Sequence, residues 1–507
     1  MDLAIVNGRI AEVAPSGRLR HERRTATMVL NLNGRLLTPG LWDAHIHLYH
    51  WSQARRQLSL ADCSDRDELL ARVEQASAGS DWLLGHGWNS SAWPENSPPT
   101  RLELDERTGE RPTLLWCSDL HSALANTAAL QLAGLWEEGL VIEGGVIERF
   151  ADGTPTGWLK EMAANVARQA VPEPAPSELK ELLETAATEL LSLGITGVCD
   201  QRIKDQNDGQ AVMTALLELD REGRWPLRAS VNLAAHHLDQ AVDLGLCTGF
   251  GSERVRFGHM KLFADGTLGS RTARMLQPFT SGGCGEDGRG LYLTDPDELK
   301  LTIAKAARSG WSVSVHAIGD EAIRLTLDCF ERLDREGVPR PRIPHRIEHV
   351  QILDSADLAR FAELDLTASV QAGHLIDDRL AADEALGPRA HQAYRFADLY
   401  QAGARLAFGT DAPVSRVEPV YGLQAALHRR WGDQSVWFED QCLPPEAVWQ
   451  GYTENAALAA GWDDLVGRLE PGLAADLVCW EGEVGEARLG FGPGPAYVIS
   501  GGKVVAQ

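Results

Sequence analysis

Two histidines separated by one residue are the first part of this sequence that could do chemistry. His45 and His47 follow a turn signal at Pro39 and Gly40 and a short apolar run that is typical of one buried strand. Alternate side chains of a strand point to the same face, so both imidazoles should lie together, with Asp43 behind them. Such a pair supplies half of a metal site, but an isolated His-x-His equally fits two hydrogen-bonded core histidines.

Further candidate ligands at the ends of later strands favour the metal site. Polar residues end or interrupt four more apolar segments, and these residues are Lys261, His316, His349 and Asp411. Each would be ordinary alone, but four histidines, one aspartate and one lysine at matching strand ends indicate a functional site. Glu348 points away from His349 in a strand, so we expect it to form an internal salt bridge, with Arg346 or with a helix.

The elements that must position these residues alternate between strands and helices. Eight apolar segments are predicted to be strands, at residues 41–47, 195–200, 227–233, 255–264, 311–316, 346–349, 366–371 and 405–411. A helix is predicted at residues 177–193, with Ser177 as its N-cap and Gly194 as its stop. Eight strand–helix units predict an α/β fold, a (β/α)8 TIM-like barrel whose active site lies at the carboxyl ends of the strands.

Two regions do not fit this repeat. At both ends of the chain, short apolar runs alternate with Asn-Gly or Gly-Gly turns, as at residues 3–6, 28–30, 475–480 and 503–505. Neither end could bury a core alone, so residues 1–38 and 463–507 should form one composite β-sandwich domain, which leaves 39–462 for the barrel. Residues 55–170 are too many for one crossover after the first strand, and we expect them to form an insertion over the barrel mouth that includes a strand at 112–118.

Composition argues against several classes of protein. The chain has 507 residues, 72 acidic against 48 basic, and no block rich in lysine and arginine, which disfavours nucleic acid and anionic membranes as partners. Its eight cysteines include no Cys-x-x-Cys pair, which argues against a thiolate zinc cluster and favours a reducing compartment. Charges near the N-terminus do not suit a signal peptide, and no apolar stretch is long enough to span a membrane, so we expect a cytoplasmic protein.

These motifs together resemble those of the metal-dependent amidohydrolase superfamily. More narrowly, the sequence is similar to the YtcJ-like branch, amidohydrolase family 3, which includes N-substituted formamide deformylase. The superfamily features are the Thr-Pro-Gly turn before His45 and His47 and the tail at residues 467–478. The branch features are residues 85–89 (Gly-His-Gly-Trp-Asn), 119–126, 155–161 and 261–273. The resemblance covers essentially the whole chain.

The resemblance implies a binuclear metal site. His45 and His47 would bind the more buried ion with Asp411, and His316 and His349 would bind the second. Lys261 would be carboxylated on its amine and bridge the two ions, since a free ammonium group repels a cation and cannot bind it. The ions would be zinc, with iron and manganese as alternatives. A single-metal site in which Lys261 stays an amine and contacts the substrate is the other interpretation.

Such a site predicts a hydrolase of carbon–nitrogen bonds. Metal coordination can lower the pKa of water from about 15.7 to about 7, so no serine or cysteine nucleophile is needed. The hydroxide would attack a carbonyl or imine carbon, and Asp411 would take a proton from water and pass it to the leaving nitrogen. His121 is the candidate for polarising the substrate, with a capping or core role as its alternative.

The candidate substrate contacts are Trp88, His121, Glu161, Arg271 and His374, and a structural role is the alternative for the last three. The 15 tryptophans outnumber 11 phenylalanines and 7 tyrosines, and many lie in the insertion, which favours flat or bulky groups such as N-aryl or N-alkyl amides, formamides or carbamates. The family usually has glycine at Leu120 and proline after Gln371, where this chain has Ala372. The identity of the substrate is therefore not carried over.

Two other functions fit part of the pattern. A deaminase of a ring carbon–nitrogen bond generally needs one metal, an acid near the fifth-strand histidine and no bridging lysine, and here Asp320 and Glu321 follow a different spacing. A non-enzymatic scaffold would keep the barrel and lose ligands, but all six ligand positions are filled. The expected partners are a small-molecule substrate and a second copy of the chain in a homodimer.

Overall fold

The computed structural model of the chain divides into two units. The structure describes residues 1–79, 81–90, 93, 98–118, 122–142, 144–202, 208–482, 485, 492 and 494–506. One unit consists of Met1–Leu48 and Leu183–Gln507, and the other of Tyr49–Leu182. Within the described ranges, no helix combines the length and the apolar character that crossing a membrane requires.

Eight parallel strands form the centre of the first unit, and their order in the sheet follows their order in the chain. They are β4 (Leu41–Ile46), β11 (Ile195–Asp200), β12 (Arg228–Ala234), β13 (Val255–Phe263), β14 (Val313–Ala317), β15 (Arg346–His349), β16 (Thr367–Val370) and β17 (Arg405–Phe408). Backbone N–H groups of Asp411 and His47 donate to the carbonyls of His45 and Ala412 and nearly close the sheet. The predicted TIM-like barrel is confirmed, and all eight predicted strands are present.

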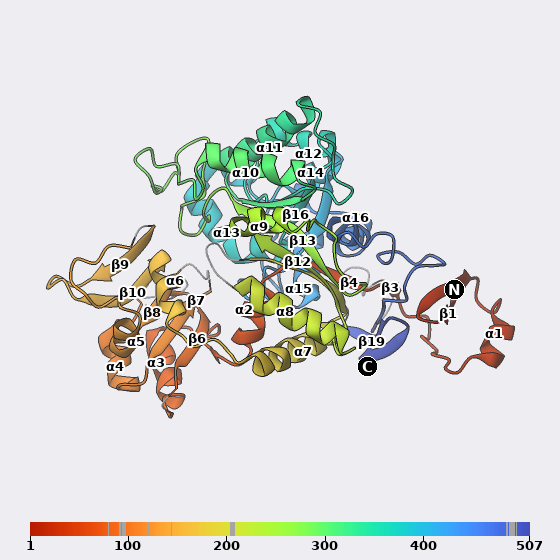
Figure 1. Cartoon of the computed structure of the whole chain (residues 1–507), viewed down its shortest axis with the longest axis horizontal. Coiled ribbons are helices and arrows are strands. Elements are labelled where there is room, and N and C mark those ends of the chain that lie inside the picture. The colour runs from red at the N-terminus through yellow and green to blue at the C-terminus, as the bar shows by residue number, and fades with distance from the viewer. Residues whose placement is uncertain are drawn as a thin grey trace. The chain divides into compact units, whose positions relative to one another are not determined.

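Helices surround this sheet (Figure 1). The longer ones are α8 (Asp208–Arg221), α10 (Pro296–Arg308), α11 (Asp320–Arg335), α13 (Ala372–Leu386) and α15 (Pro419–His428). Shorter ones are α9 (Leu238–Asp243), α12 (Arg360–Glu363), α14 (Phe396–Gln401), α16 (Pro445–Tyr452) and α17 (Glu454–Ala460).

The predicted helix before β11 is α7 (Pro176–Ser192). It begins one residue earlier than predicted, so Ser177 lies in its first turn and is not the N-cap. Proline favours the first position of a helix because its missing N–H would have no partner there. Gly194 follows the last turn with a φ of 85°, a conformation that suits a helix stop.

Close packing behind β4 depends on a small residue in β11. Trp42 is buried and its ring lies 5.3 Å from that of Trp462, between the barrel and the segment after α17. A Cβ atom at Gly197 would come within 2.3 Å of the Trp42 indole. The absence of a side chain there lets the two tryptophans fill the space beside the strand that carries His45.

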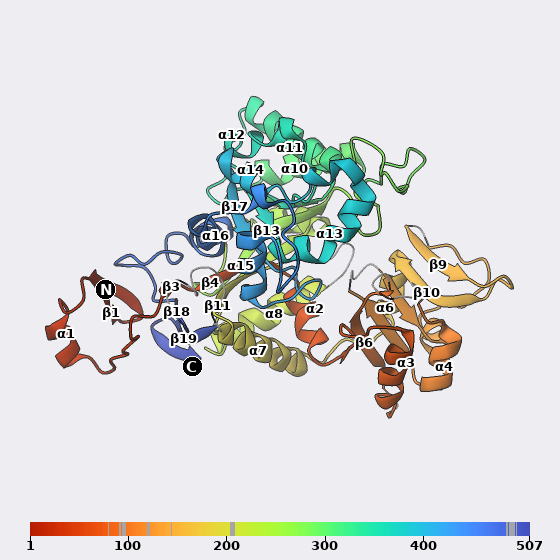
Figure 2. The ribbon, with the colours of Figure 1, turned by 180° about the vertical axis from the view of Figure 1, so that it is seen from behind.

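Strands from both ends of the chain form small antiparallel sheets. The four-stranded sheet contains β3 (Leu37–Pro39), β18 (Leu477–Trp480), β19 (Pro495–Ser500) and β20 (Lys503–Ala506), and β3 pairs with β18 (Figure 2). The hairpin of β1 (Asp2–Val6) and β2 (Arg9–Ala14) is tied to the C-terminal part by hydrogen bonds of Ile10 with Leu473 and of Ala475 with Gly8, both 2.8 Å. Side chains from both ends share one buried cluster, which holds Ile10, Ala475, Leu477 and Ile499.

The prediction of a strand at residues 28–30 is wrong. This stretch has no regular structure, Met28 is 65% exposed, and a short helix, α1 (Arg20–Thr25), precedes it. An apolar run becomes a strand only where a neighbouring strand can pair with it. Residues 37–39 have such a partner in β18, so the pairing with the C-terminal part begins there.

The second unit contains a six-stranded mixed sheet. Its strands, in sheet order, are β5 (Leu58–Ser59), β6 (Leu83–Trp88), β7 (Thr113–Cys117), β8 (Ser122–Ala125), β10 (Pro155–Glu161) and β9 (Gly145–Arg149). The accompanying helices are α2 (Leu48–Ala54), α3 (Arg66–Gln75), α4 (Arg101–Thr108), α5 (Thr127–Leu132) and α6 (Met162–Gln169). The strand predicted at 112–118 is β7. The location of residues 55–170 over the barrel mouth stays a prediction.

Candidate metal centre

Three side chains from the first and last barrel strands meet at one point. The Oδ1 atom of Asp411 lies 3.3 Å from Nε2 of His45 and 3.1 Å from Nε2 of His47. All three side chains are buried. They come together because β4 and β17, which are far apart in the sequence, are neighbours where the barrel closes. The predicted His-x-His pair and Asp411 therefore form one group that could hold a metal ion.

Asp411 is held in an uncommon backbone conformation. Its φ of 61° lies in the left-handed region, which residues other than glycine rarely adopt. The neighbouring Thr410 donates from its hydroxyl and its backbone N–H to Asp43, at 2.5 and 2.9 Å. Asp43 also accepts from the backbone N–H of His45 at 3.1 Å. One buried carboxylate thus ties together the two segments that carry the candidate ligands.

Glu348 supports His45 from inside the barrel. Its Oε2 lies 2.7 Å from Nδ1 of His45, and its Oε1 accepts from Nε of Arg346 at 2.8 Å. The predicted internal salt bridge with Arg346 is confirmed, and the contact with His45 is an additional role. Burial alone would raise the pKa of Glu348, but Arg346 and His45 hold it well below its usual range. A carboxylate at Nδ1 keeps the proton there and leaves Nε2 as the ligand atom.

His349 is oriented by a side chain from the next strand. Its Nδ1 lies 2.8 Å from Oε1 of Gln371, which follows β16, so Nδ1 donates and Nε2 carries the lone pair. Burial, reinforced by the charges of His316 and His45, lowers the pKa of His349 well below its usual value. The imidazole is therefore neutral at physiological pH, and neutral imidazole is the form that binds metals.

His316 lies beside His349, with ring centroids 4.5 Å apart. Its Nε2 is 3.1 Å from the carbonyl oxygen of Gly266, so Nε2 carries the hydrogen and a metal bond would use Nδ1. Asp265 holds the adjoining loop by accepting the backbone N–H groups of Ile318 and Gly319 at 3.0 and 2.8 Å. Burial raises the pKa of Asp265 to about 7 in spite of these hydrogen bonds.

Lys261 is buried in the barrel, 2% exposed, and its charge acts on His45 and His349. Its Nζ lies 5.0 Å from the centre of the Phe263 ring. Burial lowers the pKa of Lys261 to about 8, against the opposing effect of the Glu348 and Asp411 carboxylates. A larger fraction of this amine is therefore uncharged near neutral pH than for an exposed lysine.

His374 reaches the same region from the first turn of α13. Its Nε2 lies 3.7 Å from Oδ2 of Asp411, and its ring is nearly parallel to that of His349, at 9°. Nε2 of Gln351 lies 3.3 Å from its Nδ1. His349, His374 and Asp411 form a second group that could hold a metal ion, with one ligand atom of each within 4.8 Å of the others.

The donor set fits a divalent cation. Nε2 of His45, Nε2 of His374 and Oδ1 of Asp411 are buried, and in the part of the chain that the structure describes none makes a hydrogen bond of normal geometry. Buried polar atoms almost always have a partner, so their convergence indicates a missing one. Imidazole nitrogens together with a carboxylate suit zinc, iron or manganese.

The remaining predicted contact residues occupy different environments. Trp88 is fully buried in the second unit, where its indole N–H donates to the carbonyl of Leu115 at 3.2 Å. Glu161 ends β10 in the same unit, with a φ of 52°. Arg271, in the first unit, pairs with Glu384 at 2.7 Å. His121 and Leu120 lie outside the described residues.

Sequence reasoning missed the residues that orient the candidate ligands. Gln351 and Gln371 each contact a histidine of the site, and Thr410 positions Asp411 through Asp43. All three follow the carboxyl end of a barrel strand within a few residues. That position was the available signal, because side chains there face the mouth of the barrel.

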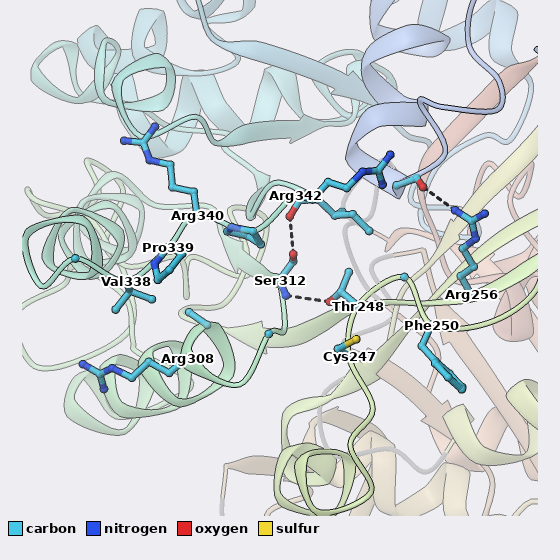
Figure 3. A pocket seen from close by; sticks show the side chains of 17 residues that line it. Cys247, Thr248, Phe250, Arg256, Arg308, Ser312, Val338, Pro339, Arg340 and Arg342 are labelled. Carbon is cyan, nitrogen blue, oxygen red and sulfur yellow. Dashed lines mark hydrogen bonds between the residues drawn. The ribbon is translucent and has the colours of Figure 1, made fainter.

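A separate cavity lies at the amino ends of β13 and β14 (Figure 3). Its volume is about 890 Å³, and it is lined by residues such as Arg256, Ser312 and Arg342. Several of its arginines already have acidic partners, for example Arg342 with Asp463 at 3.2 Å. No candidate metal group of the described residues lies in this cavity. Both candidate metal groups lie instead at the opposite, carboxyl ends of the strands.

Comparison with known proteins adds a family and a fold. A model described as "Amidohydrolase family" matches residues 28–506. The chain is 32% identical to Protein LONG AFTER FAR-RED 3 of Arabidopsis thaliana, an alignment that covers 94% of this chain and 83% of that protein. It is 30% identical to the Bacillus subtilis protein named "Putative amidohydrolase YtcJ", over 90% of this chain and 86% of that protein. It is 27% identical to N-substituted formamide deformylase of Arthrobacter pascens, over 94% of this chain and 88% of that protein.

Solved structures agree with this result. An uncharacterized metal-dependent hydrolase from Pyrococcus horikoshii superposes with a TM-score of 0.79 at 26% identity, covering 97% of this chain and 95% of that one. A second metal-dependent hydrolase, from Pyrococcus furiosus, gives a TM-score of 0.74 at 28% identity, covering 94% of each chain.

Proposed function

Because this chain belongs to the amidohydrolase family and is a metal-dependent hydrolase, we propose that it cleaves a carbon–nitrogen bond in a small amide, formamide or carbamate. The observation that carries this proposal is the convergence of two buried candidate metal groups on Asp411, at the carboxyl ends of the barrel strands. The similarity to N-substituted formamide deformylase supports the choice of bond, since that relative acts on a carbon–nitrogen bond by its name.

The proposed cofactor is a pair of divalent ions, with zinc as the first candidate and iron or manganese as alternatives. His45, His47 and Asp411 would hold one ion, and His316 and His349 would hold the other. When bound, such an ion lowers the pKa of a coordinated water from about 15.7 to about 7 and polarises the substrate oxygen.

The proposed catalytic residue is Asp411, which transfers the proton. Burial alone would raise the pKa of Asp411, but His45 and His47 hold it well below its usual range, so the carboxylate is ionised at neutral pH. In this form it can accept a proton from the attacking water and deliver it to the leaving nitrogen. Glu348 holds the proton of His45 at Nδ1, so that His45 does not compete for this transfer.

Lys261 is proposed to be carboxylated. An uncharged amine can add carbon dioxide, and the loss of one proton then leaves an anionic carbamate with two oxygen atoms. Burial, which lowers the pKa of Lys261 to about 8, favours the uncharged amine. A carbamate would also supply negative charge among the histidines, where an ammonium group would oppose a bound cation.

The proposed pocket contacts are Arg271 and His374 from the first unit and Glu161 from the second, with His121 polarising the substrate. A Trp-rich second unit suits substrates with an aryl or bulky alkyl group on nitrogen.

The test combines metal analysis with a substrate panel. Protein purified without chelator is expected to contain about two ions per chain and to show the extra mass of one carboxyl group on the peptide that contains Lys261, under conditions that preserve carbamates. It should hydrolyse N-aryl or N-alkyl formamides, amides or carbamates, lose activity with a chelator and regain it with zinc. One ion and a free amine would instead favour a single-metal deaminase. Metal-free protein without hydrolytic activity would contradict the proposal.

A further inference from the structure

We propose that His374 is itself a metal ligand, and that Asp411 joins two cation positions by presenting one carboxylate oxygen to each. Each oxygen has two lone pairs, so one that binds an ion can still accept the proton of the attacking water. This inference rests on the proposed function, because it concerns the ions of the same site, and it gives His374 the role of a metal ligand in place of the substrate contact proposed above. It adds to that site a ligand from the segment after β16, which would bind the second ion together with His349.

The distances around Asp411 are those of a shared ligand. Its Oδ1 atom faces His45 and His47, at 3.3 and 3.1 Å, whereas its Oδ2 atom faces His374 at 3.7 Å. Two ligands of one tetrahedral zinc ion are separated by about 3.4 Å, because each metal–nitrogen bond is about 2.0–2.1 Å. The 3.7 Å contact is too long for a hydrogen bond and is close to this separation between two ligands of one ion.

His374 has a buried nitrogen that nothing else in the described structure satisfies. Its side chain is 7% exposed, and its Nε2 makes no hydrogen bond of normal geometry among the described residues. A buried imidazole nitrogen without a partner is costly unless an ion or a ligand completes it. A cation held jointly with Asp411 would satisfy this atom.

Gln351 can set the required tautomer of His374. Its amide nitrogen lies 3.3 Å from Nδ1, while its amide oxygen is also buried without a hydrogen bond. The oxygen and nitrogen of an amide exchange places on a half-turn, after which the oxygen accepts from Nδ1 and the lone pair lies on Nε2. Gln371 already makes this arrangement with His349, at 2.8 Å. Two parallel histidines, each next to a glutamine, would then present Nε2 to one position.

The fold holds His374 in place relative to Asp411. Asp377, one turn further along α13, accepts hydrogen bonds from Ser415 and Tyr421 at 2.7 and 2.6 Å. Both donors follow Asp411 in the sequence, one in the loop after β17 and one in α15. The start of α13 is therefore fixed to the segment that carries the shared carboxylate, which is the preorganisation that a metal ligand needs.

The inference can be tested by cobalt titration of metal-free protein. Co²⁺ bound to nitrogen and oxygen ligands absorbs visible light, so stoichiometry and affinity can be measured without substrate. The wild type is expected to bind two ions. His374→Ala and His374→Asn should keep one ion at wild-type affinity and bind the second at least about tenfold more weakly, while Gln351→Leu should weaken the same ion by about 10–100-fold.

Two controls separate the possible failures. His391→Ala removes an exposed histidine and should bind both ions as the wild type does. Thermal unfolding of the metal-free variants checks their folding, and His374→Asn keeps a polar group of similar size if the alanine variant is unstable. If His374→Asn binds both cobalt ions like the wild type, the inference is wrong and the proposed function stands. If the wild type binds no metal at all, the proposed function fails, and this inference fails with it.

Discussion

At the scale of single residues, the centre depends on the protonation state that burial and neighbours impose on each side chain. Asp411 and Glu348 are buried carboxylates that stay ionised because cationic groups or histidines adjoin them, whereas His349 is kept neutral. The Asp411 carboxylate also raises the pKa of His45 above its usual value, against the effect of burial. A site that favours protonated His45 is one in which positive charge is stabilised, and a bound cation supplies that charge.

Asp411→Asn is expected to lower kcat by about 10²–10⁴, because the amide has nearly the same shape but cannot accept the proton of the attacking water. The metal content should fall as well, since an amide is a weaker ligand than a carboxylate. Both quantities are measured on purified protein with the best substrate of the panel. The control is Asp328→Asn, which removes an exposed carboxylate that pairs with Arg360 at 2.7 Å. Near-normal kcat in Asp411→Asn would refute the proposed proton transfer.

Glu348→Gln is expected to destabilise the protein by about 3–5 kcal/mol, because it leaves Arg346 as a buried charge without its carboxylate. It should also weaken metal binding, since His45 loses the group that orients it. Urea unfolding of metal-free protein measures the first effect and metal titration the second. Glu336→Gln, which breaks an exposed pair with Arg332, should change the stability little. If Glu348→Gln had the same free energy of unfolding as the wild type, the buried pair of Arg346 and Glu348 would not be needed for stability.

At the scale of elements, the geometry of the site depends on how closely the last strand approaches the first. Gly409 follows β17 and lies directly against the backbone of His45 in β4. Two hydrogen bonds between backbone groups then join the segments just beyond, from Asp411 to His45 at 2.6 Å and from His47 to Ala412 at 3.0 Å. Barrel closure and assembly of the candidate ligands are thus the same structural event.

Gly409→Ala is expected to push these two segments apart, because a Cβ atom there would come 2.3 Å from the backbone nitrogen of His45. Overpacking of this kind costs about 1–3 kcal/mol, and affinity for the ion at His45 and His47 should fall with it. Unfolding and metal titration measure the two effects. Gly269→Ala is the matched control, since nothing lies within 4 Å of its added Cβ. If the two variants had equal stability and equal metal affinity, the close approach of Gly409 to His45 would not be required.

At the scale of the whole molecule, buried titratable groups contribute to the pH dependence of stability with opposite signs. Burial lowers the pKa of His345 to about 4 and that of His259 to about 3. Below pH 6.5 the unfolded chain binds these protons and the folded chain does not, so stability is lost as pH falls. Burial raises the pKa of Asp43 to about 6 and that of Asp265 to about 7, so stability from these groups is lost as pH rises.

Because these contributions oppose each other, the test compares two proteins instead of following one. His345→Asn removes one titrating group and keeps a hydrogen-bond acceptor for the backbone N–H of Val313, which lies 3.0 Å from the imidazole. Between pH 7 and pH 5, the free energy of unfolding of the wild type should fall by about 2 kcal/mol more than that of the variant. Urea unfolding at both pH values measures it. A difference that does not change with pH would show that His345 is protonated equally in both states.

The sequence by itself determined the barrel and most of its candidate ligands. Eight apolar segments separated by helices predict the strand order without any long-range information, because a parallel sheet needs a crossover between successive strands. Polar residues that end those segments, such as His45, His349 and Asp411, could be recognised because strand ends of a barrel share one face. Short runs such as residues 28–30 could not be assigned correctly, since a strand at the edge of a small sheet depends on its partner.

Only the tertiary structure decided which of these residues touch. Periodicity states which side of a strand a residue occupies, but it does not state which strand lies opposite or how near it comes. The contact of Glu348 with His45 crosses the interior of the barrel, and the approach of His374 to Asp411 depends on how α13 packs against the segment after β17. Such distances follow from closure and packing of the whole barrel. The physical reason is that the hydrophobic pattern of the sequence determines which residues are buried, whereas the packing of side chains against each other determines where each residue lies.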